Sequence, residues 1–108
     1  MADEGIYGLL GLACRAGLVV SGEFDVERQL NKNAVCAVLL DGEASENTKK
    51  RFSDACARRS VRLYTGFEAG RLGRAIGKDN RKIAALKKGK LSERILTLLD
   101  TSSEGESV

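Results

Sequence analysis

Histidine and proline are absent from the 108 residues of this chain, and its apolar runs are short. Without histidine no Cys–His dyad or mixed Cys/His zinc site is available, and Cys14, Cys36 and Cys56 show no Cys-x-x-Cys spacing. A membrane-spanning helix needs about 20 consecutive apolar residues, so none is expected. The first residues, Met-Ala-Asp-Glu, are acidic, the reverse of a secretory signal. We therefore expect a cytoplasmic protein with reduced, packed thiols and no metal site.

Signatures of nucleotide binding are also missing. The stretch 73–78, Gly-Arg-Ala-Ile-Gly-Lys, has one residue too few between its glycines for a phosphate loop, and neither Ser nor Thr follows the lysine. No Gly-x-Gly-x-x-Gly follows an expected strand, so a dinucleotide cofactor is not indicated. The carboxylates gather at expected helix starts, where they complement the helix dipole. We expect no catalytic residue, no cofactor and no enzymatic activity.

The length and composition fit a single modest domain. With 43% apolar and 31% charged residues, the chain has enough material for one core and too little for two ordinary domains. The stretch 101–108 is rich in Ser and Glu and ends in its one apolar residue, Val108. Such a composition predicts a disordered acidic tail after a single domain at 1–100.

The net charge of +3 is unevenly distributed. Nine basic residues lie between Arg71 and Arg94 against Asp79 and Glu93, whereas residues 1–70 and 95–108 are on balance acidic. A concentrated positive surface attracts polyanions, and cations that neutralise phosphates release counterions. The alternative, on charge alone, is a solvated face that keeps the protein soluble.

Hydrophobic periodicity predicts helices at 6–17, 23–32, 46–59, 68–76 and 91–99, and strands at 18–21, 34–40, 62–65 and 81–86. The strand at 34–40 is a continuous apolar run, typical of a central strand covered on both faces. Ser45 is expected to cap the third helix, and Gly17 and Gly77 to end the first and fourth. This alternation predicts the α/β class, as a three-layer α/β/α sandwich around a mixed sheet of about four strands.

The start of the second helix carries an unusual set of side chains. Gly22 stands at the N-cap, and Asp25 and Arg28, three residues apart, share a face beside the exposed first-turn N–H groups. Such an end holds phosphate through its backbone, while an ionised Asp and an Arg fork hydrogen-bond a guanine edge. The structural alternative is that Glu23, Asp25 and Glu27 are ordinary helix-start acids that repel phosphate.

Four segments at matching spacing resemble one known family. They are Leu9–Gly17, Val20–Gly22, Asp41 with Ala44–Thr48, and Leu72–Asp79. Together they are similar to the bacterial YlxQ-like branch of the kink-turn-binding ribosomal-protein family, the ribosomal L-seven-Ae type, over residues 6–99. The resemblance implies an α/β/α sandwich and non-enzymatic RNA binding, with structured or ribosomal RNA, and the ribosome itself, as partners of a monomer.

The resemblance also implies which residues contact RNA. In that family the second helix begins Gly-Thr-Asn-Glu-x-x-Lys and meets the sheared G·A pairs of a kinked RNA. The corresponding positions here are Gly22, Glu23, Phe24, Asp25 and Arg28. Gly22 and Arg28 keep the pattern, Asp25 is a shortened Glu, and Phe24 replaces Asn. Phe24 cannot hydrogen-bond, so it either stacks an unpaired base or is a staple buried on the core.

The family's second contact surface is the loop after the fourth helix, here Gly77–Lys82. This loop is charged where kink-turn binders often carry small apolar side chains, so it is expected to grip phosphate. The remaining expected RNA contacts are Lys32, Lys78, Asn80, Arg81 and Lys82. Gly73 is expected to permit close helix packing. The alternative function is a protein-interaction module of the same fold, with its basic face against an acidic partner.

Overall fold

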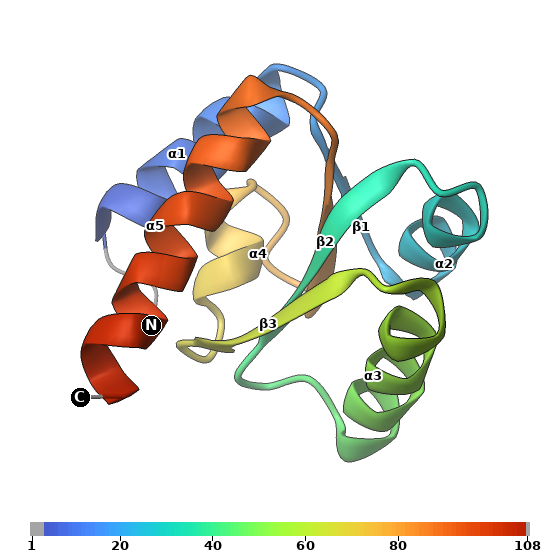
Figure 1. The fold of residues 1–108 in the computed structure, drawn as a ribbon. Helices are drawn as coiled ribbons and strands as arrows, with labels where there is room; N and C mark the ends of the chain where they lie inside the picture. The colour runs from blue at the N-terminus through green and yellow to red at the C-terminus, as the bar shows by residue number, and fades with distance from the viewer. Residues whose placement is uncertain (1–3, 108) are drawn as a thin grey trace.

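The computed structural model describes the backbone of residues 4–107 and the side chains of residues 4–101. Helices and strands alternate along this part of the chain as predicted (Figure 1). The helices are α1 (Glu4–Arg15), α2 (Glu23–Asn31), α3 (Glu46–Arg59), α4 (Arg71–Ala75) and α5 (Lys90–Ser107). The strands are β1 (Val19–Ser21), β2 (Val35–Asp41), β3 (Arg62–Phe67) and β4 (Ile83–Lys87). The α/β class is therefore confirmed.

The strands form one mixed 4-stranded sheet in the order β1-β4-β2-β3. Strand β2 runs parallel to β3 and antiparallel to β4, and β4 runs antiparallel to β1. Nearly every residue of β2 is buried, because the strand has neighbours on both sides and helices over both faces. The prediction that 34–40 is a central strand is confirmed.

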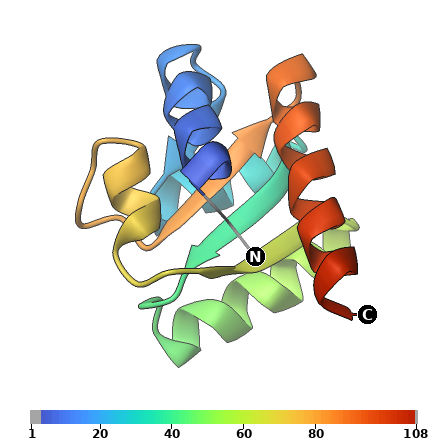
Figure 2. The same cartoon turned by 90° about the vertical axis from the view of Figure 1, so that its left-hand side faces the viewer.

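Helices cover both faces of the sheet. Helices α1, α4 and α5 lie over one face and α2 and α3 over the other (Figures 1 and 2). Alternate side chains of a strand point to opposite faces, and Leu39 of β2 accordingly packs with the first group while Val38 and Leu40 pack with the second. This arrangement confirms the predicted α/β/α sandwich.

The predicted helix signals act as expected. The Ser45 Oγ accepts a hydrogen bond from the Thr48 N–H at 3.1 Å and so caps α3. Gly17 and Gly77 both have φ +77, the left-handed conformation that ends a helix. After Gly17 the Leu18 N–H returns to the Ala13 carbonyl at 2.9 Å.

Several predicted boundaries are wrong by two or more residues, among them the start of α1 at Glu4 and the start of β4 at Ile83. Helix α4 begins at Arg71 rather than 68, because Gly70, with φ +79, makes a turn before it. Strand β3 continues to Phe67, since Phe67 pairs with Asp41 across an irregularity in the register. Helix α5 continues past the predicted end at Leu99 to Ser107.

The extension of α5 has a simple physical basis. Once a helix is nucleated, each further residue adds one hydrogen bond at small cost, and no proline interrupts this one. The hydroxyls of Thr97 and Thr101 donate to the carbonyls of Glu93 and Thr97, four residues earlier, at 3.0 and 2.8 Å, which gives these side chains hydrogen-bond partners within the helix. Within residues 4–107, no helix combines the length and apolar character needed to cross a bilayer.

Candidate nucleic-acid interface

The start of α2 and the loop at 77–82 form one surface. Strand β1 leads into Gly22 and the loop leads into β4, and these two strands are paired, with Ser21 opposite Ala84. The Gly22 N–H donates to the Ile83 carbonyl at 3.0 Å, so this amide is occupied. The other N–H groups in the first turn of α2 have no hydrogen-bond acceptor within the helix, because no helical carbonyl lies four residues before them. We call Gly22–Arg28 together with Gly77–Lys82 the α2–loop surface.

Arg81 lies directly on the backbone at Gly22. A Cβ added to Gly22 would be 2.7 Å from the Arg81 Nη1, and Gly22 also has φ +90. The conformation therefore favours glycine, and a methyl group there would also displace the end of the Arg81 side chain. The Arg81 Nε is buried and has no hydrogen-bond partner among the described residues, which is uncommon for a buried N–H. The guanidinium is thus placed at the centre of the surface by packing.

The loop before Arg81 folds back over α4. A Cβ on Gly73 would overlap the carbonyl oxygen of Lys78 and lie 2.9 Å from that of Arg81. The Lys78 N–H donates to the Gly73 carbonyl at 2.8 Å. Gly73 thus permits close approach of the loop, whereas the close contact of α1 with α4 occurs at Gly11, where a Cβ would lie 3.2 Å from the Ala75 carbonyl oxygen. The prediction that Gly73 serves helix packing is corrected accordingly.

Arg81 lines two hollows, with volumes of about 200 and 190 Å³. The first is lined by Cys14, Val19, Val20, Ser21, Asp25, Ile76, Lys78 and Arg81. The second is lined by Gly22, Glu23, Thr48, Asn80, Arg81, Lys82 and Ile83. Both are smaller than the roughly 300–1,000 Å³ of typical cofactor sites, so each suits part of a nucleotide better than a whole cofactor.

The outer part of the surface joins an aromatic ring, an acid and a cation. Phe24 is 75% exposed, so the alternative that it is a staple buried on the core is wrong. The Arg28 Cζ lies 5.7 Å from the centre of the Phe24 ring, and the Arg28 Nη2 donates to the Asp25 Oδ1 at 3.3 Å. The ring, the guanidinium and the carboxylate are therefore available together to a base and its phosphate.

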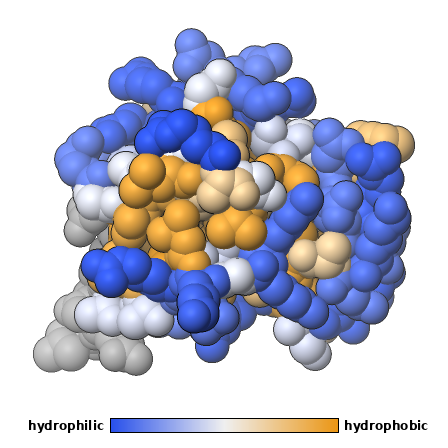
Figure 3. Space-filling view, turned by 90° about the horizontal axis from the view of Figure 1, so that it is seen from above, coloured by the Kyte–Doolittle hydropathy of each residue, from blue (hydrophilic) through white to orange (hydrophobic). Residues whose placement is uncertain are grey.

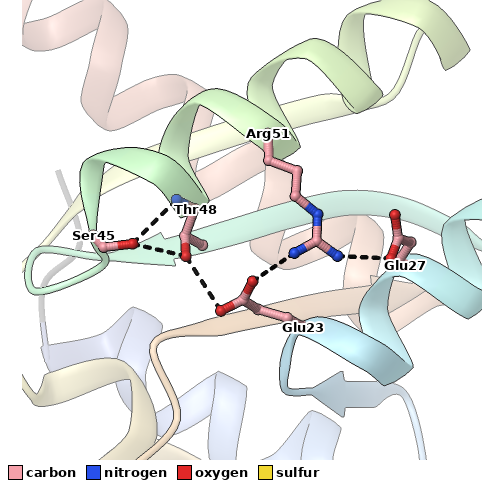
Figure 4. A network of polar contacts seen from close by, with 5 residues as sticks. All are labelled: Glu23, Glu27, Ser45, Thr48 and Arg51. Atoms are coloured by element: carbon pink, nitrogen blue, oxygen red, sulfur yellow. Dashed lines mark hydrogen bonds and ion pairs between the residues drawn. The ribbon is translucent and has the colours of Figure 1, made fainter.

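Glu23 faces α3 rather than the outer surface (Figure 4). Its Oε1 accepts a hydrogen bond from the Arg51 Nη1 at 2.8 Å, and its Oε2 accepts one from the Thr48 Oγ1 at 3.2 Å. Arg51 also donates to the Glu27 Oε1 at 2.7 Å, and Thr48 accepts from the Ser45 Oγ at 2.9 Å. Two of the three acids at the start of α2 therefore hold α2 to α3.

The cations of the predicted set differ in their partners. Lys82 donates to the Glu43 Oε1 at 2.7 Å, and this hydrogen bond raises the pKa of Lys82. Lys78 is exposed and forms no ion pair among the described residues. Lys32 caps the other end of α2, about 15 Å from Gly22 at 1.5 Å per residue. The structure brings together all the predicted residues except Lys32.

Asp41, singled out by the sequence, is a buried structural carboxylate. Its Oδ2 accepts the N–H groups of Glu43 and Gly70, each at 2.9 Å, and its Oδ1 accepts that of Leu72 at 3.1 Å. Asp41 is only 1% exposed. It therefore ties the end of β2 to the start of α4 and positions the loop that follows.

Sequence reasoning missed the apolar walls of the first hollow. Val20 and Ile76 lie on β1 and at the end of α4, and the Cys14 thiol of α1 donates to the Ile76 carbonyl at 3.6 Å. These elements are distant in sequence, so only the fold brings them together.

No group of three or more His, Cys, Asp or Glu side chains in the described part of the chain is arranged to hold a metal ion.

Comparison with known proteins gives several matches. The model of the ribosomal protein L7Ae/L30e/S12e/Gadd45 family matches residues 4–96. RNA-binding protein YlxQ of Bacillus subtilis (strain 168) is 37% identical over 94 residues, which are 87% of this chain and 94% of that protein. RNA-binding protein YlxQ of Enterococcus faecium is 30% identical over 81 residues, 75% of this chain and 79% of that protein.

Solved structures are similar over most of the chain. A protein of unknown function from Bacillus halodurans C has a TM-score of 0.84 and 32% identity, covering 91% of this chain and 99% of that one. The Giardia lamblia 15.5kD RNA binding protein has a TM-score of 0.72 and 16% identity, covering 94% and 92% respectively. At that identity the second likeness shows the fold alone.

Proposed function

Because the chain belongs to the ribosomal protein L7Ae/L30e/S12e/Gadd45 family, we propose that it is an RNA-binding protein without enzymatic activity. Its relatives from Bacillus subtilis and Enterococcus faecium carry the name RNA-binding protein. We further propose that it acts as a monomer in the cytoplasm and that its ligand is a structured RNA, ribosomal or kink-turn-like.

The observation that carries the proposal is the contact between Gly22 and Arg81. It joins two segments, each expected to contact RNA, into one surface with a guanidinium at its centre. A planar guanidinium fork suits phosphate and guanine edges. The two hollows beside Arg81 add concave, partly polar surface of a size suited to part of a nucleotide.

Each side chain has a distinct task in this proposal. Lys78 and Arg81 bind phosphate, and Phe24 stacks an unpaired base through its exposed ring. Asp25 and Arg28 exchange their mutual ion pair for hydrogen bonds to a base edge. Glu23 keeps its hydrogen bonds to α3, so it positions the start of α2 and does not itself contact RNA.

A gel-shift titration tests the proposal with three RNAs, a kink-turn, an unkinked duplex and a single strand. Arg28→Ala should cost about 1–3 kcal/mol on the preferred RNA and reduce the preference. Lys78→Ala should weaken all three RNAs alike and lower the salt slope by about 1. Lys50→Ala, an exposed change on α3, is the matched control and should leave binding unchanged.

Two results would contradict the proposal. The absence of salt-sensitive binding to any of the three RNAs would favour the protein-interaction alternative. Equal and small losses for Arg28→Ala and Lys78→Ala would remove the assignment of a base-reading edge and leave only general polyanion attraction.

A further inference from the structure

An apolar patch lies around the turn between β4 and α5, at the end of α2 remote from the α2–loop surface. It consists of Leu18, Cys36 and Leu91, all of them partly exposed. The Cys36 thiol donates to the Leu86 carbonyl at 3.5 Å, and a Cβ on Gly89 would lie 3.2 Å from the Leu18 Cδ2. Figure 3 looks onto this end and shows apolar surface bordered by hydrophilic side chains.

Basic residues lie at the same end of the sheet as this patch. They are Arg15, Lys32, Arg59, Lys87, Lys88 and Lys90, at the ends of α1, α2, α3 and β4 and the start of α5, and we call them the basic rim. Lys87 pairs with Val35 across the sheet, and its N–H donates to the Leu18 carbonyl at 2.8 Å. Arg59 donates to the Asn31 Oδ1 at 2.8 Å, which joins the ends of α3 and α2.

The rim cations are not neutralised. Among the described residues, none of the six takes part in an ion pair. Glu93, in the first turn of α5, is an acid close to Cys36, and its charge raises the Cys36 pKa further after the larger effect of burial. The surface around the patch therefore carries an uncompensated positive charge.

Only some residues of the basic rim have a role in stabilising the fold. Arg15 and Arg59 lie in the last turns of α1 and α3, where a cation offsets the negative end of the helix dipole. Lys88 and Lys90 flank the N-terminus of α5, where the dipole disfavours a cation. Since these two lysines act against the helix they adjoin, a binding role accounts for them better than a stabilising one.

We propose that this face docks an acidic segment of a protein partner. Apolar side chains of the segment cover Leu18, Cys36 and Leu91, and its carboxylates face Lys88 and Lys90. RNA fits this surface less well, because the patch has no aromatic ring on which a base could stack. The proposal is independent of RNA binding, since it uses other residues at another end of the molecule.

Fluorescence anisotropy of the intact protein tests this, with a short labelled peptide of Glu and Leu at helical spacing as the probe. We expect salt-sensitive binding that weakens roughly tenfold when Ser replaces each Leu of the peptide. The double change Lys88→Glu and Lys90→Glu should weaken it roughly tenfold as well. Lys49→Glu with Lys50→Glu, on α3, changes the net charge equally and should preserve binding.

Three results of the peptide assay would overturn the proposal. The peptide would not bind, or the two double variants would lose equal affinity for it, or the Leu and Ser peptides would bind equally well. A larger loss of RNA affinity than of peptide affinity in the Lys88/Lys90 variant would assign the face to RNA. Self-association that this variant abolishes in sedimentation would assign it to a second copy. Lys88→Gln with Lys90→Gln repeats the test if charge reversal disturbs the fold.

Discussion

The Arg81 guanidinium lies against Gly22, so close that a methyl group on Gly22 would lie 2.7 Å from the Arg81 Nη1. This contact joins α2 to the loop before β4. The φ of +90 explains why a glycine starts α2 although Gly22 makes no side-chain cap. The contact is the basis of the first two predictions.

Gly22→Ala should both destabilise the protein and weaken RNA binding. A backbone at φ 90 and ψ 147 costs an L-residue about 1–3 kcal/mol, and the methyl group displaces Arg81. Urea unfolding and gel shifts measure the two losses. Gly8→Ala is the control, because a Cβ there meets nothing within 4 Å and should stabilise α1 by roughly 0.5–1 kcal/mol. Unchanged RNA affinity in Gly22→Ala would show that Arg81 does not need its position.

Arg81→Met should weaken RNA binding by about 1–3 kcal/mol with little loss of stability. The buried Nε has no partner among the described residues, so its removal leaves no group unsatisfied. Filter binding and thermal unfolding separate the two effects. Arg81→Lys, which keeps the charge without the planar fork, should restore binding only in part. A large fall in stability with unchanged affinity would make Arg81 a structural residue.

Arg51→Leu should lower the free energy of unfolding by about 1 kcal/mol, because it breaks the network that joins α2 and α3. The loss should shrink at high salt, since the side chain is 42% exposed. RNA affinity should stay near the wild-type value. Urea titrations at two salt concentrations, with Lys50→Ala as the comparison, test this. A strong loss of RNA affinity would place the network within the recognition surface.

Asp41→Asn should destabilise the protein by about 2–3 kcal/mol, since a buried carboxylate that accepts three backbone N–H groups loses charge and acceptor capacity. Faster hydrogen exchange at the amides of Gly70 and Leu72 should accompany the loss. Global unfolding without any local change at these two amides would contradict the assigned role.

Cys56 should resist thiol reagents until the protein unfolds. It is 2% exposed, and burial raises its pKa above the ordinary 9.0. The unfolded chain then ionises at lower pH than the folded one. The raised pKa of Cys56 therefore contributes to the stability of the fold below about pH 9. This contribution is lost as the pH rises through the pKa of Cys56 in the folded state. Thiol titration at pH 8 with and without urea measures the protection, and rapid labelling in the native state would contradict it.

The fold was predictable because its signals are local. The apolar run of β2, the Ser45 cap and the left-handed glycines each act within a few residues, and the structure confirms them. The start of α4 was misplaced because the turn at Gly70 is held from a distance: Asp41, far away in sequence, accepts the N–H groups of Gly70 and Leu72. A long-range hydrogen bond of this kind leaves no mark in the local pattern.

The candidate surface was predictable in outline only. The resemblance identified α2 and the loop, and the structure places Arg81 of the loop against Gly22 at the start of α2. The sequence did not reveal that Glu23 faces Arg51, or that Arg81 lies on Gly22. It also gave no reason to separate Lys32, which shares α2 with Gly22 but caps the opposite end. These facts depend on packing between elements.

The loop Gly77–Lys82 packs against Gly73, and this packing affects the free energy of ligand binding. Its carbonyls lie against α4 and its turn closes through Lys78 and Arg81, whose carbonyl and N–H are 2.9 Å apart. Ordering a flexible loop costs about 1–2 kcal/mol per residue in backbone entropy. Since contacts within the chain itself hold this loop, little of that cost should remain at the moment of association, and its few charges can yield more affinity than the same charges on a mobile segment.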